Sequence, residues 1–576
     1  MPIQSRFTTL VPEVSLQKWV FDSSFCALPD VKAFIDSDNP HERFLTLSDF
    51  RLLSKRVALG LQKAGLHPGD RVLLFSGNSI FFPPIFMGIL MAGGIFTGAS
   101  PAFGSRELAH QLKDSGATLA IAGRSTLPVV LGAASQSGLP SSSIYAFDHS
   151  LSAVDENNPR GIKHWSCLLA DIEEAERFDW VEPADPRTTS CCLNYSSGTT
   201  GLPKGVEITH YAYVANGEAC IRLNLMDPYW SEKAGAKRSL CFLPLYHAAG
   251  QTTFVANNPK MRIPTYIMQA YNFNKVLRHV QDFKISDLGT APQVVLQIAK
   301  SPLTDKYDLS SITDVICGTA PLSSEIAEAA EKKLWPNGGN FIRQGWSMTE
   351  VTCSGALWSH DDGVRTSSVG EIVPNAVFQI RNGDVEVTEP NKPGELWFSG
   401  PTLMKGYWCN PRATAETIIK ENGIRWLKTG DFAYVDRHGP GAKIFIVDRL
   451  KELIKVRGFQ GVLLERDDVV DAGVVGIQVN GAEVPRAYIV KNSAVTEQEI
   501  TKWIEEKGGD LRGGIAFVDS IPRTQSGKII RRVLREWAAR ELGGQLIVVP
   551  VEELFKAIDY VAILSPPEGI CESTYL

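Results

Sequence analysis

The chain has 576 residues, with 58 Lys or Arg and 64 Asp or Glu, so its formal net charge is −6 at pH 7. At roughly 100–200 residues per domain, this length excludes a short peptide or a lone binding module. With 44% hydrophobic and 21% charged residues, the composition is that of an ordinary globular protein without the strongly basic field of a nucleic-acid-binding protein. Any anionic partner must therefore be bound locally.

The cysteines and the two ends of the chain indicate a reducing compartment. The ten cysteines include no C-x-x-C pair, so neither a zinc site nor a disulfide scaffold is predicted. The first residues, MPIQSRFTTLVPEV, lack a charged region followed by an apolar run, so no secretory signal is expected. The chain ends with Thr574-Tyr575-Leu576, where Tyr575 replaces the basic residue of a peroxisomal tripeptide. We expect a cytoplasmic protein.

The first part of the chain predicts strands alternating with helices. An amphipathic helix is predicted over residues 47–65 and a strand over 71–77. Residues 72–105 carry no charge and are long enough to span a bilayer, but Pro83-Pro84 and Gly93-Gly94 interrupt them. We therefore interpret this stretch as a buried strand, helix and strand, and expect no transmembrane segment. A helix over 105–116 and a strand over 118–123 continue the pattern of a parallel α/β sheet.

The alternation of strands and helices returns in residues 239–317, where loops directly follow predicted strands. In such folds ligands bind at the loops that follow strand ends. Short strands separated by Gly, Pro and Asn turns then predict a small β subdomain at about residues 366–447. The fold class is therefore α/β: a large N-terminal domain, residues 1–449, of two α/β sheet subdomains and a small β-barrel-like subdomain. A small α+β C-terminal domain would occupy 450–576, ending in a loose tail at about 564–576.

The clearest chemical signal is the segment YSSGTTGLPKG at residues 195–205, which follows the apolar run TTSCCLN. Its backbone N–H groups, its hydroxyl groups and the Lys204 ammonium could bind a polyphosphate. It is not a Walker A loop, because Pro203 precedes Lys204 and Gly205 follows where Ser or Thr should be. The candidate phosphate-binding residues are Ser196, Ser197, Gly198, Thr199, Thr200, Gly201 and Lys204.

This loop begins an ordered series of motifs that resembles the adenylate-forming acyl-CoA synthetase (AMP-binding) family, and within it the 4-coumarate–CoA ligase-like branch. The later motifs are PLYHAAG (244–250), GTAP (318–321), QGWSMTE (344–350), GELWFSGPTLMKGYW (394–408), KTGDFAYVD (428–436), DRLKELIKVRGFQ (448–460) and PRTQSGKIIRR (522–532). The resemblance covers nearly the whole chain. It implies a two-step reaction: a carboxylate attacks the α-phosphate of ATP and displaces pyrophosphate, and the thiol of CoA then attacks the acyl-adenylate. ATP, Mg²⁺ and coenzyme A are the expected cofactors and co-substrates.

For the first step, the resemblance implies that residues 196–204 hold the β- and γ-phosphates. Thr349 would contact the α-phosphate, and Glu350 would coordinate Mg²⁺. Lys528 would bridge the substrate carboxylate and the α-phosphate and is the first choice for a catalytic residue. Positive charge and a metal are needed because several negative groups meet where further charge develops.

For the nucleotide, the resemblance implies that Asp431 accepts hydrogen bonds from the ribose hydroxyls, with Arg449 nearby. Trp346 would stack on the adenine, at a position where the family usually has Tyr, and still supplies an aromatic face. The remaining candidate nucleotide-binding residues are Gly318, Thr319, Ala320, Pro321, Gln344 and Gly345.

The acid pocket is expected beside PLYHAAG, where Tyr246, His247 and Ala248 follow a strand end. The resemblance makes His247 a gate or wall between the acid and thiol sites. The further wall positions are Gly289, Gly318, Gly345 and Cys353. Their small size suggests room for a planar ring and favours an aromatic acid, while fatty and other acids remain open.

For the second step, the resemblance implies that the C-terminal domain rotates about a hinge at Lys451, which removes Lys528 and brings the loop 455–460 to the site. Gly458 would let pantetheine pass, and Lys455 and Gln460 would face the adenylate. The sequence departs from the family pattern at two points, directly after Gln460 and within 503–519, where it is shortened. Both departures bear on thioester formation more than on adenylation.

The predicted function is therefore an ATP- and Mg²⁺-dependent carboxylic acid–CoA ligase for an aryl, heteroaryl or arylalkenyl acid. The alternatives are an adenylating enzyme that passes its acyl group to a separate carrier protein, and a degenerate protein that binds nucleotide or acid without turnover. No carrier is fused, because Leu546 stands in ELGGQL where a phosphopantetheine-bearing Ser would be. A luciferase-like oxidation of the adenylate is not favoured, because it would need a specialised luciferin as substrate. The presence of Lys528, Glu350 and Asp431 argues against a degenerate protein.

Overall fold

The computed structural model describes residues 2–152, 161–196, 203–360, 365–449, 459–479, 482–507, 510–524, 527 and 529–541. The chain divides into two compact units. The large unit comprises Met1–Leu450 together with Arg523–Ile529, and the small unit comprises Lys451–Pro522 together with Ile530–Leu576.

The first sheet of the large unit runs in the order β22-β10-β9-β5-β4-β6-β7-β8. In that order its strands are Gly406–Tyr407, Lys204–Thr209, Ser190–Ser196, Ile95–Gly98, Arg71–Phe75, Leu119–Gly123, Ile144–Phe147 and Lys163–His164. The strands from β9 to β8 pair in parallel, whereas β10 pairs antiparallel with both of its neighbours. The long uncharged stretch forms β4, α3 (Phe82–Met91) and β5, so its interpretation as strand, helix and strand is confirmed.

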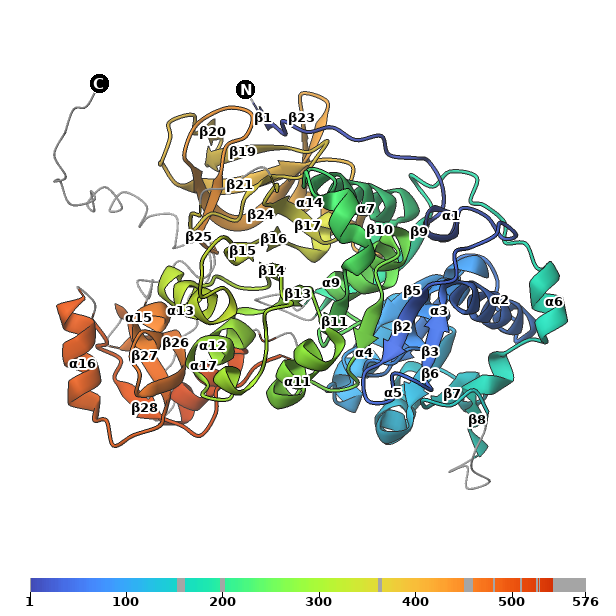
Figure 1. Ribbon diagram of the computed structural model, residues 1–576, viewed down its shortest axis with the longest axis horizontal. Helices are drawn as coiled ribbons and strands as arrows, with labels where there is room; N and C mark the ends of the chain where they lie inside the picture. Colours follow the sequence, from blue (N-terminus) through green and yellow to red (C-terminus); the bar gives the residue numbers. More distant parts are fainter. Residues whose placement is uncertain are drawn as a thin grey trace. The chain divides into compact units, whose positions relative to one another are not determined.

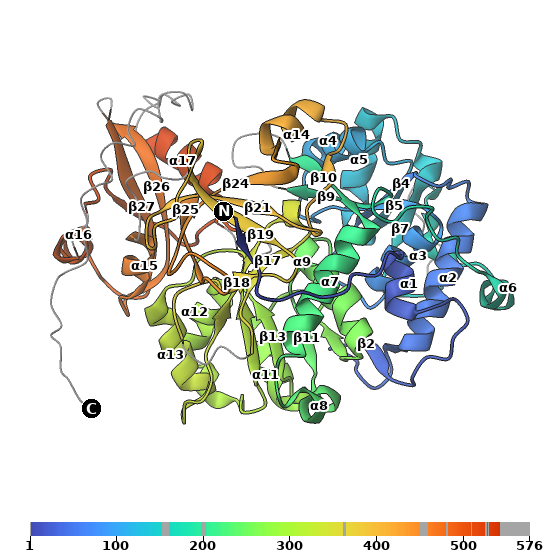
Figure 2. The same ribbon diagram turned by 90° about the horizontal axis from the view of Figure 1, so that it is seen from above.

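Side chains of β4 alternate between two hydrophobic cores, because successive strand residues point to opposite faces of a sheet. Val72 and Leu74 pack with α2 and α3, whereas Leu73 and Phe75 pack with α4 and α5. Figure 2 shows α4 and α5 on one side of β4 and β5, and α2 and α3 on the other. The helices that flank this sheet are α2 (Leu47–Lys63), α4 (Ser105–Ser115) and α5 (Leu127–Ser137).

The uncharged helix α3 lacks a polar face because all ten of its residues are buried. Its neighbour α2 begins where a capping box satisfies the first backbone donors: the Asp49 N–H donates to Thr46 Oγ1 at 3.1 Å and the Thr46 N–H to Asp49 Oδ2 at 2.9 Å. Within the part of the chain that the structure describes, no helix has the length and apolarity needed to cross a membrane.

The second sheet runs in the order β15-β14-β13-β11-β12-β2-β3 and is parallel except for the pair β2 and β3. Its strands are Arg343–Gln344, Asp314–Cys317, Asp287–Thr290, Ser239–Cys241, Thr265–Ile267, Lys32–Asp36 and Phe44–Thr46. The motif PLYHAAG comes soon after the end of β11, and GTAP directly follows β14. Both motifs therefore lie beyond the carboxyl ends of parallel strands, where ligands bind in open α/β sheets.

The remaining helices of the large unit connect these sheets. They are α1 (Leu16–Phe21), α6 (Ile172–Arg177), α7 (His210–Asn224), α8 (Trp230–Lys233), α9 (Ala248–Gly250), α10 (Asn258–Met261), α11 (Phe273–Phe283), α12 (Pro292–Lys300), α13 (Ser324–Leu334) and α14 (Pro411–Thr417). A π-helix, Gln251–Asn257, lies between α9 and α10. Such segments are rare and occur frequently at functional sites.

The β subdomain contains an antiparallel sheet in the order β1-β19-β21-β24-β23, to which β20 and β25 are added. These strands are Ile3–Gln4, Val377–Asn382, Gly394–Ser399, Ile424–Val435, Ile418–Glu421, Val385–Glu386 and Ile444–Arg449. A smaller sheet joins β16 (Trp346–Ser347), β17 (Ser354–Leu357) and β18 (Glu371–Ile372). The N-terminal strand β1 lies along β19, with Ile3 opposite Phe378, so the start of the chain completes this subdomain (Figure 1).

The small unit has its own sheet, in which β26 (Val469–Val479) pairs antiparallel with β27 (Ala482–Lys491) and β28 (Ile515–Phe517) is added in parallel. Its helices are α15 (Phe459–Leu464), α16 (Glu497–Glu506) and α17 (Arg531–Glu541). Gly473 on β26 allows α17 to approach closely, because a Cβ at this position would lie 2.7 Å from Leu534 Cδ1. The two units therefore have the folds that the sequence predicted: α/β for the large unit and α+β for the small one.

Candidate active site

The ends of the phosphate loop are fixed by a β-hairpin. Ser196 ends β9 and Lys204 begins β10, and the two residues are register partners across the ladder. Beside the loop, the hydroxyl of Tyr195 donates to Asp114 Oδ2 at 2.7 Å, and the carbonyl of Pro203 lies 2.9 Å from His110 Nε2. The candidates Ser197, Gly198, Thr199, Thr200 and Gly201 lie outside the described residues.

A single tyrosine connects the loop lysine to the candidate metal ligand. The Lys204 ammonium lies 4.4 Å from the centroid of the Tyr407 ring. The Tyr407 hydroxyl donates to Glu350 Oε1 at 3.0 Å, and both residues are 8% exposed. Burial and the Glu350 carboxylate raise the pKa of Tyr407, so this hydroxyl stays a donor. The Lys204 ammonium and the Glu350 carboxylate thus both contact Tyr407.

A single carboxylate, that of Glu350, fits a magnesium ion that is also bound by substrate phosphates and water, and does not fit a metal held by protein side chains alone. Among the described residues, no three or more His, Cys, Asp or Glu side chains gather in a cluster that could hold a metal. Magnesium is usually bound by one or two carboxylates together with substrate phosphates and water. Glu350, which accepts from the Tyr407 hydroxyl, can supply such a carboxylate.

The PLYHAAG loop is held in one conformation by contacts at both of its ends. The side chain of Asn78 donates to the Leu243 carbonyl at 3.0 Å and accepts from the Leu245 N–H at 2.9 Å. A Cβ on Gly250 would lie 2.2 Å from the Pro244 carbonyl oxygen, so only glycine fits there. The Ala249 N–H points to His247 Nδ1 at 3.5 Å, a long contact in which this ring nitrogen must be unprotonated.

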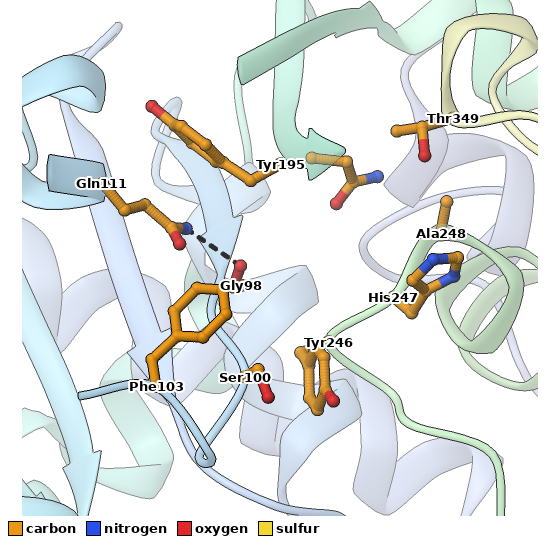
Figure 3. A pocket seen from close by; sticks show the side chains of 10 residues that line it. Gly98, Ser100, Phe103, Gln111, Tyr195, Tyr246, His247, Ala248 and Thr349 are labelled. Atoms are coloured by element: carbon orange, nitrogen blue, oxygen red, sulfur yellow. Dashed lines mark hydrogen bonds between the residues drawn. The ribbon is translucent and has the colours of Figure 1, made fainter. Parts of the chain in front are cut away.

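A cavity lies where this loop meets the end of β9 (Figure 3). It holds about 40 Å³ and brings Tyr246, His247, Ala248 and Thr349 together, four residues that the sequence placed at the acid and α-phosphate sites. The other lining residues, none of them predicted, are Gly98, Ser100, Phe103, Gln111, Asn194 and Tyr195. The amide of Gln111 donates to the Gly98 carbonyl at 3.0 Å, which fixes one wall (Figure 3).

A second cavity, of about 780 Å³, lies at the carboxyl ends of both parallel sheets. It is lined after β4 and β6 by Asn78 and Arg124, and on the side of the second sheet by Phe242 and Tyr271. Tyr246 borders both cavities, and the larger one has a size typical of sites that bind organic ligands.

On the nucleotide side, the Trp346 indole N–H donates to Asp431 Oδ2 at 2.7 Å, and both residues are buried. The indole ring packs on Gly355, where a Cβ would lie 2.1 Å away, and at a tilt against Phe398. Trp346 therefore orients the carboxylate expected to bind ribose, and its stacking on adenine stays a prediction. Asp431 is the register partner of Arg449, whose side chain lies outside the described part.

The GTAP loop has a strained backbone at Thr319, where φ is +73°. A β-branched residue rarely adopts this conformation, and such strain concentrates at functional sites. Its buried Oγ1 has no hydrogen-bond partner within the described residues. The loop continues through Ala320 and Pro321. At its end, the Leu322 N–H donates to Gln344 Oε1 at 3.0 Å.

The predicted wall positions differ in the space around them. Added Cβ atoms at Gly289 and Gly318 would meet nothing closer than 3.8 Å and 3.9 Å, whereas one at Gly345 would lie 3.0 Å from Leu357 Cδ2. The nearest atom to Gly289 belongs to the ring of Phe254, in the π-helix. Burial raises the pKa of the Cys353 thiol, which disfavours the thiolate that a nucleophile would need.

The predicted residues of the C-terminal domain are described only in part. Gln460 lies in the first turn of the short helix α15. Lys451, Lys455, Gly458 and Lys528 lie outside the described residues.

Sequence reasoning missed Asn194, Gln111 and Tyr407. Asn194 lies only two residues before the phosphate loop, so its place on the loop's own strand was a usable signal. Tyr407 lies in a motif that was recognised without a role for this residue. Nothing in the local sequence pointed to Gln111, which reaches the site from α4.

Comparison with known proteins agrees with this geometry. Residues 22–408 match the AMP-binding enzyme family, and residues 460–528 match the AMP-binding enzyme C-terminal domain. A phenylacetyl-CoA ligase from Aspergillus niger is 32% identical over 545 residues, covering 91% of this chain and 97% of that protein. A 4-coumarate–CoA ligase from Pinus taeda is 32% identical over 552 residues, covering 92% of this chain and 98% of that protein.

Solved structures share the fold. ATP-bound MatB from Rhodopseudomonas palustris aligns with a TM-score of 0.74 at 20% identity, covering 92% of this chain and 99% of that one. The anthranilate CoA ligase AuaEII, solved with anthranoyl-AMP, aligns with a TM-score of 0.75 at 21% identity, covering 92% and 98%. Because the family match spans more than half of the sequence, this chain belongs to the AMP-binding enzyme family.

Proposed function

We propose that this protein is an ATP-dependent carboxylic acid–CoA ligase that forms an acyl-adenylate and then an acyl-CoA thioester from an aryl, heteroaryl or arylalkenyl acid. The observation that carries the proposal is the cavity in which the end of the phosphate-loop strand meets Tyr246, His247 and Thr349. A carboxylate there would lie between the phosphate loop and the larger cavity.

In the first step the enzyme must hold ATP and a carboxylate together against their mutual repulsion. Lys204 supplies positive charge at the β- and γ-phosphates, and Glu350, held by Tyr407, supplies the carboxylate for Mg²⁺. Bound Mg²⁺ would neutralise charge on the leaving pyrophosphate. Asp431, oriented by Trp346, accepts from the ribose, and Lys528 bridges the carboxylate and the α-phosphate.

An aryl acid is favoured by the space near the glycines and by the relatives. Gly289 and Gly318 leave room for a flat ring, and Phe254 supplies an apolar face beside Gly289. The relatives that match over most of the chain include enzymes named for phenylacetate and 4-coumarate, both of which are aryl acids.

In the second step we propose that the C-terminal domain turns about Lys451 and brings Lys455, Gly458 and Gln460 toward the adenylate.

The test is mass spectrometry of the products formed by the purified protein with ATP, Mg²⁺ and a panel of benzoic, phenylacetic, cinnamic, pyridine-carboxylic and fatty acids, each with and without CoA. An aryl-CoA formed in preference to a fatty acyl-CoA is the expected result. An acyl-AMP that persists in the presence of CoA would refute the CoA ligase and point to a carrier-protein acceptor. A preference for fatty acids would refute the acid class.

A further inference from the structure

A cluster of polar side chains is buried directly behind the small cavity. It consists of Cys192 and Asn194 on β9, Tyr213 on α7 and Gln251, the first residue of the π-helix. These residues, which we name the amide cluster, are between 0% and 3% exposed. Groups of this kind are costly to bury unless their hydrogen bonds are made, so the partners of each polar atom show what the cluster holds in place.

Gln251 lies at the centre of the cluster and uses both ends of its amide. Its Nε2 donates to Asn194 Oδ1 at 3.0 Å and to the Tyr246 carbonyl at 2.9 Å. Its Oε1 accepts from Asn194 Nδ2 at 3.1 Å and from the Tyr213 hydroxyl at 2.5 Å. The two amides therefore form a reciprocal pair, and the Tyr246 carbonyl, which can only accept, fixes which way the Gln251 amide faces.

The two groups that Gln251 connects belong to the two reacting sides of the site. Asn194 lies two residues before Ser196, on the strand that carries the phosphate loop, and it lines the cavity. The Tyr246 carbonyl immediately precedes His247, on the wall expected to face the acid. A Cβ on Gly98 would lie 2.9 Å from the same Tyr246 carbonyl oxygen, so the loop also packs tightly against β5.

We infer that Gln251 is a positioning residue for adenylation: through Asn194 and the Tyr246 carbonyl it fixes the distance between the ATP-binding strand and the acid-binding loop. The inference rests on the proposed function and adds a residue that reaches neither substrate. A fixed separation matters because attack on the α-phosphate needs the reacting atoms in near-contact, and a misplacement of about 1 Å can cost about 100-fold in rate. Loss of Gln251 should therefore lower kcat more than it weakens ATP binding.

The experiment compares Gln251→Met with Asn258→Leu. Methionine keeps the length of the side chain and removes its hydrogen bonds. Asn258 is a matched control, because it is also a buried amide (4% exposed), follows the π-helix in α10, and donates at 2.9 Å to Thr265 Oγ1 without lining either cavity. Both variants remove a buried amide, but Gln251→Met loses the four hydrogen bonds described above and Asn258→Leu loses the one to Thr265, so Gln251→Met should lose more thermal stability.

The readout is acid-dependent exchange of pyrophosphate into ATP by the full chain, with kcat and KM for ATP determined per folded protein. We expect kcat to fall about 10- to 100-fold in Gln251→Met with KM for ATP within about 3-fold, and kcat to change less than about 3-fold in Asn258→Leu. Equal losses in the two variants, or an unchanged kcat in Gln251→Met, would overturn the inference.

Tyr213→Phe guards against poor folding of Gln251→Met. It removes only the hydroxyl that donates to Gln251 Oε1 and accepts from Asn194 Nδ2, and phenylalanine fills the same space. A smaller fall in kcat, again with KM for ATP unchanged, is expected, and a change in KM alone would contradict the inference. The wild-type protein keeps the two proposals apart. If it showed no pyrophosphate exchange with any acid of the panel, the proposed function would be refuted. If the wild type exchanged normally and the variants kept a normal kcat, only the role of Gln251 would be refuted.

Discussion

Replacing Trp346 with Phe separates the two roles that its indole could have. An aromatic ring is retained beside Phe398, but phenylalanine lacks the outer indole atoms Cζ3 and Cη2 that face Gly355, and the 2.7 Å hydrogen bond to Asp431 is lost. The Asp431 backbone should stay in place, because its N–H donates to Thr429 Oγ1 at 3.0 Å and that hydroxyl donates to the Leu396 carbonyl at 2.6 Å. Only the orientation of the carboxylate is then disturbed.

The magnitude follows from the kind of bond that is removed. A hydrogen bond to a charged group contributes about 1.5–3 kcal/mol, and 1.4 kcal/mol corresponds to about tenfold in affinity. Since Asp431 would contact the ribose in both the ground state and the transition state, its misorientation should weaken both equally. We expect KM for ATP to rise about tenfold in Trp346→Phe, with kcat within about 3-fold of wild type.

The assay is the exchange of pyrophosphate into ATP at saturating acid and varied ATP. Trp180→Phe is the matched control, because Trp180 is also buried and its indole donates at 2.8 Å to a carboxylate, that of Glu182. Trp180 lines neither cavity. An unchanged KM for ATP in Trp346→Phe, or an equal rise in Trp180→Phe, would refute the idea that the indole N–H orients the ribose ligand.

Three further predictions address the backbone, the catalytic lysine and stability. Gly250→Ala should lower both the melting temperature and the adenylation rate, because its Cβ would overlap the Pro244 carbonyl oxygen at 2.2 Å; wild-type values for both would contradict the packing. Lys528→Ala should abolish acyl-adenylate formation while ATP binding by calorimetry stays within about 3-fold, since the lysine acts mainly in the transition state; adenylation at the wild-type rate would remove its assignment. Burial lowers the pKa of His210 to about 4, and its Nδ1 accepts from the Leu16 N–H at 3.2 Å. The unfolded state therefore binds more protons between about pH 6.5 and 4, so this histidine should cost stability as the pH falls through that window, and the melting temperature of His210→Asn should fall less there than that of wild type.

The sequence alone was sufficient for features that depend on local patterns. The continuous apolar run of β4 predicted a buried strand, and the interrupted apolar stretch predicted the helix α3 between two strands. The phosphate loop and the later motifs predicted the family, because the order and the residue types of those motifs are themselves the evidence. Each of these inferences uses residues that are neighbours in the chain.

The tertiary structure decided which side chains hold the candidate site together. Trp346 bonds to Asp431 across 85 positions, and Tyr407 to Glu350 and Gln251 to Asn194 each across 57 positions. Periodicity predicts which face of a helix or strand is buried, but it does not say which distant residue lies opposite. A buried hydrogen bond forms only when two elements are packed at one separation and orientation, and that geometry is a property of the assembled sheets and helices, so no local pattern encodes it.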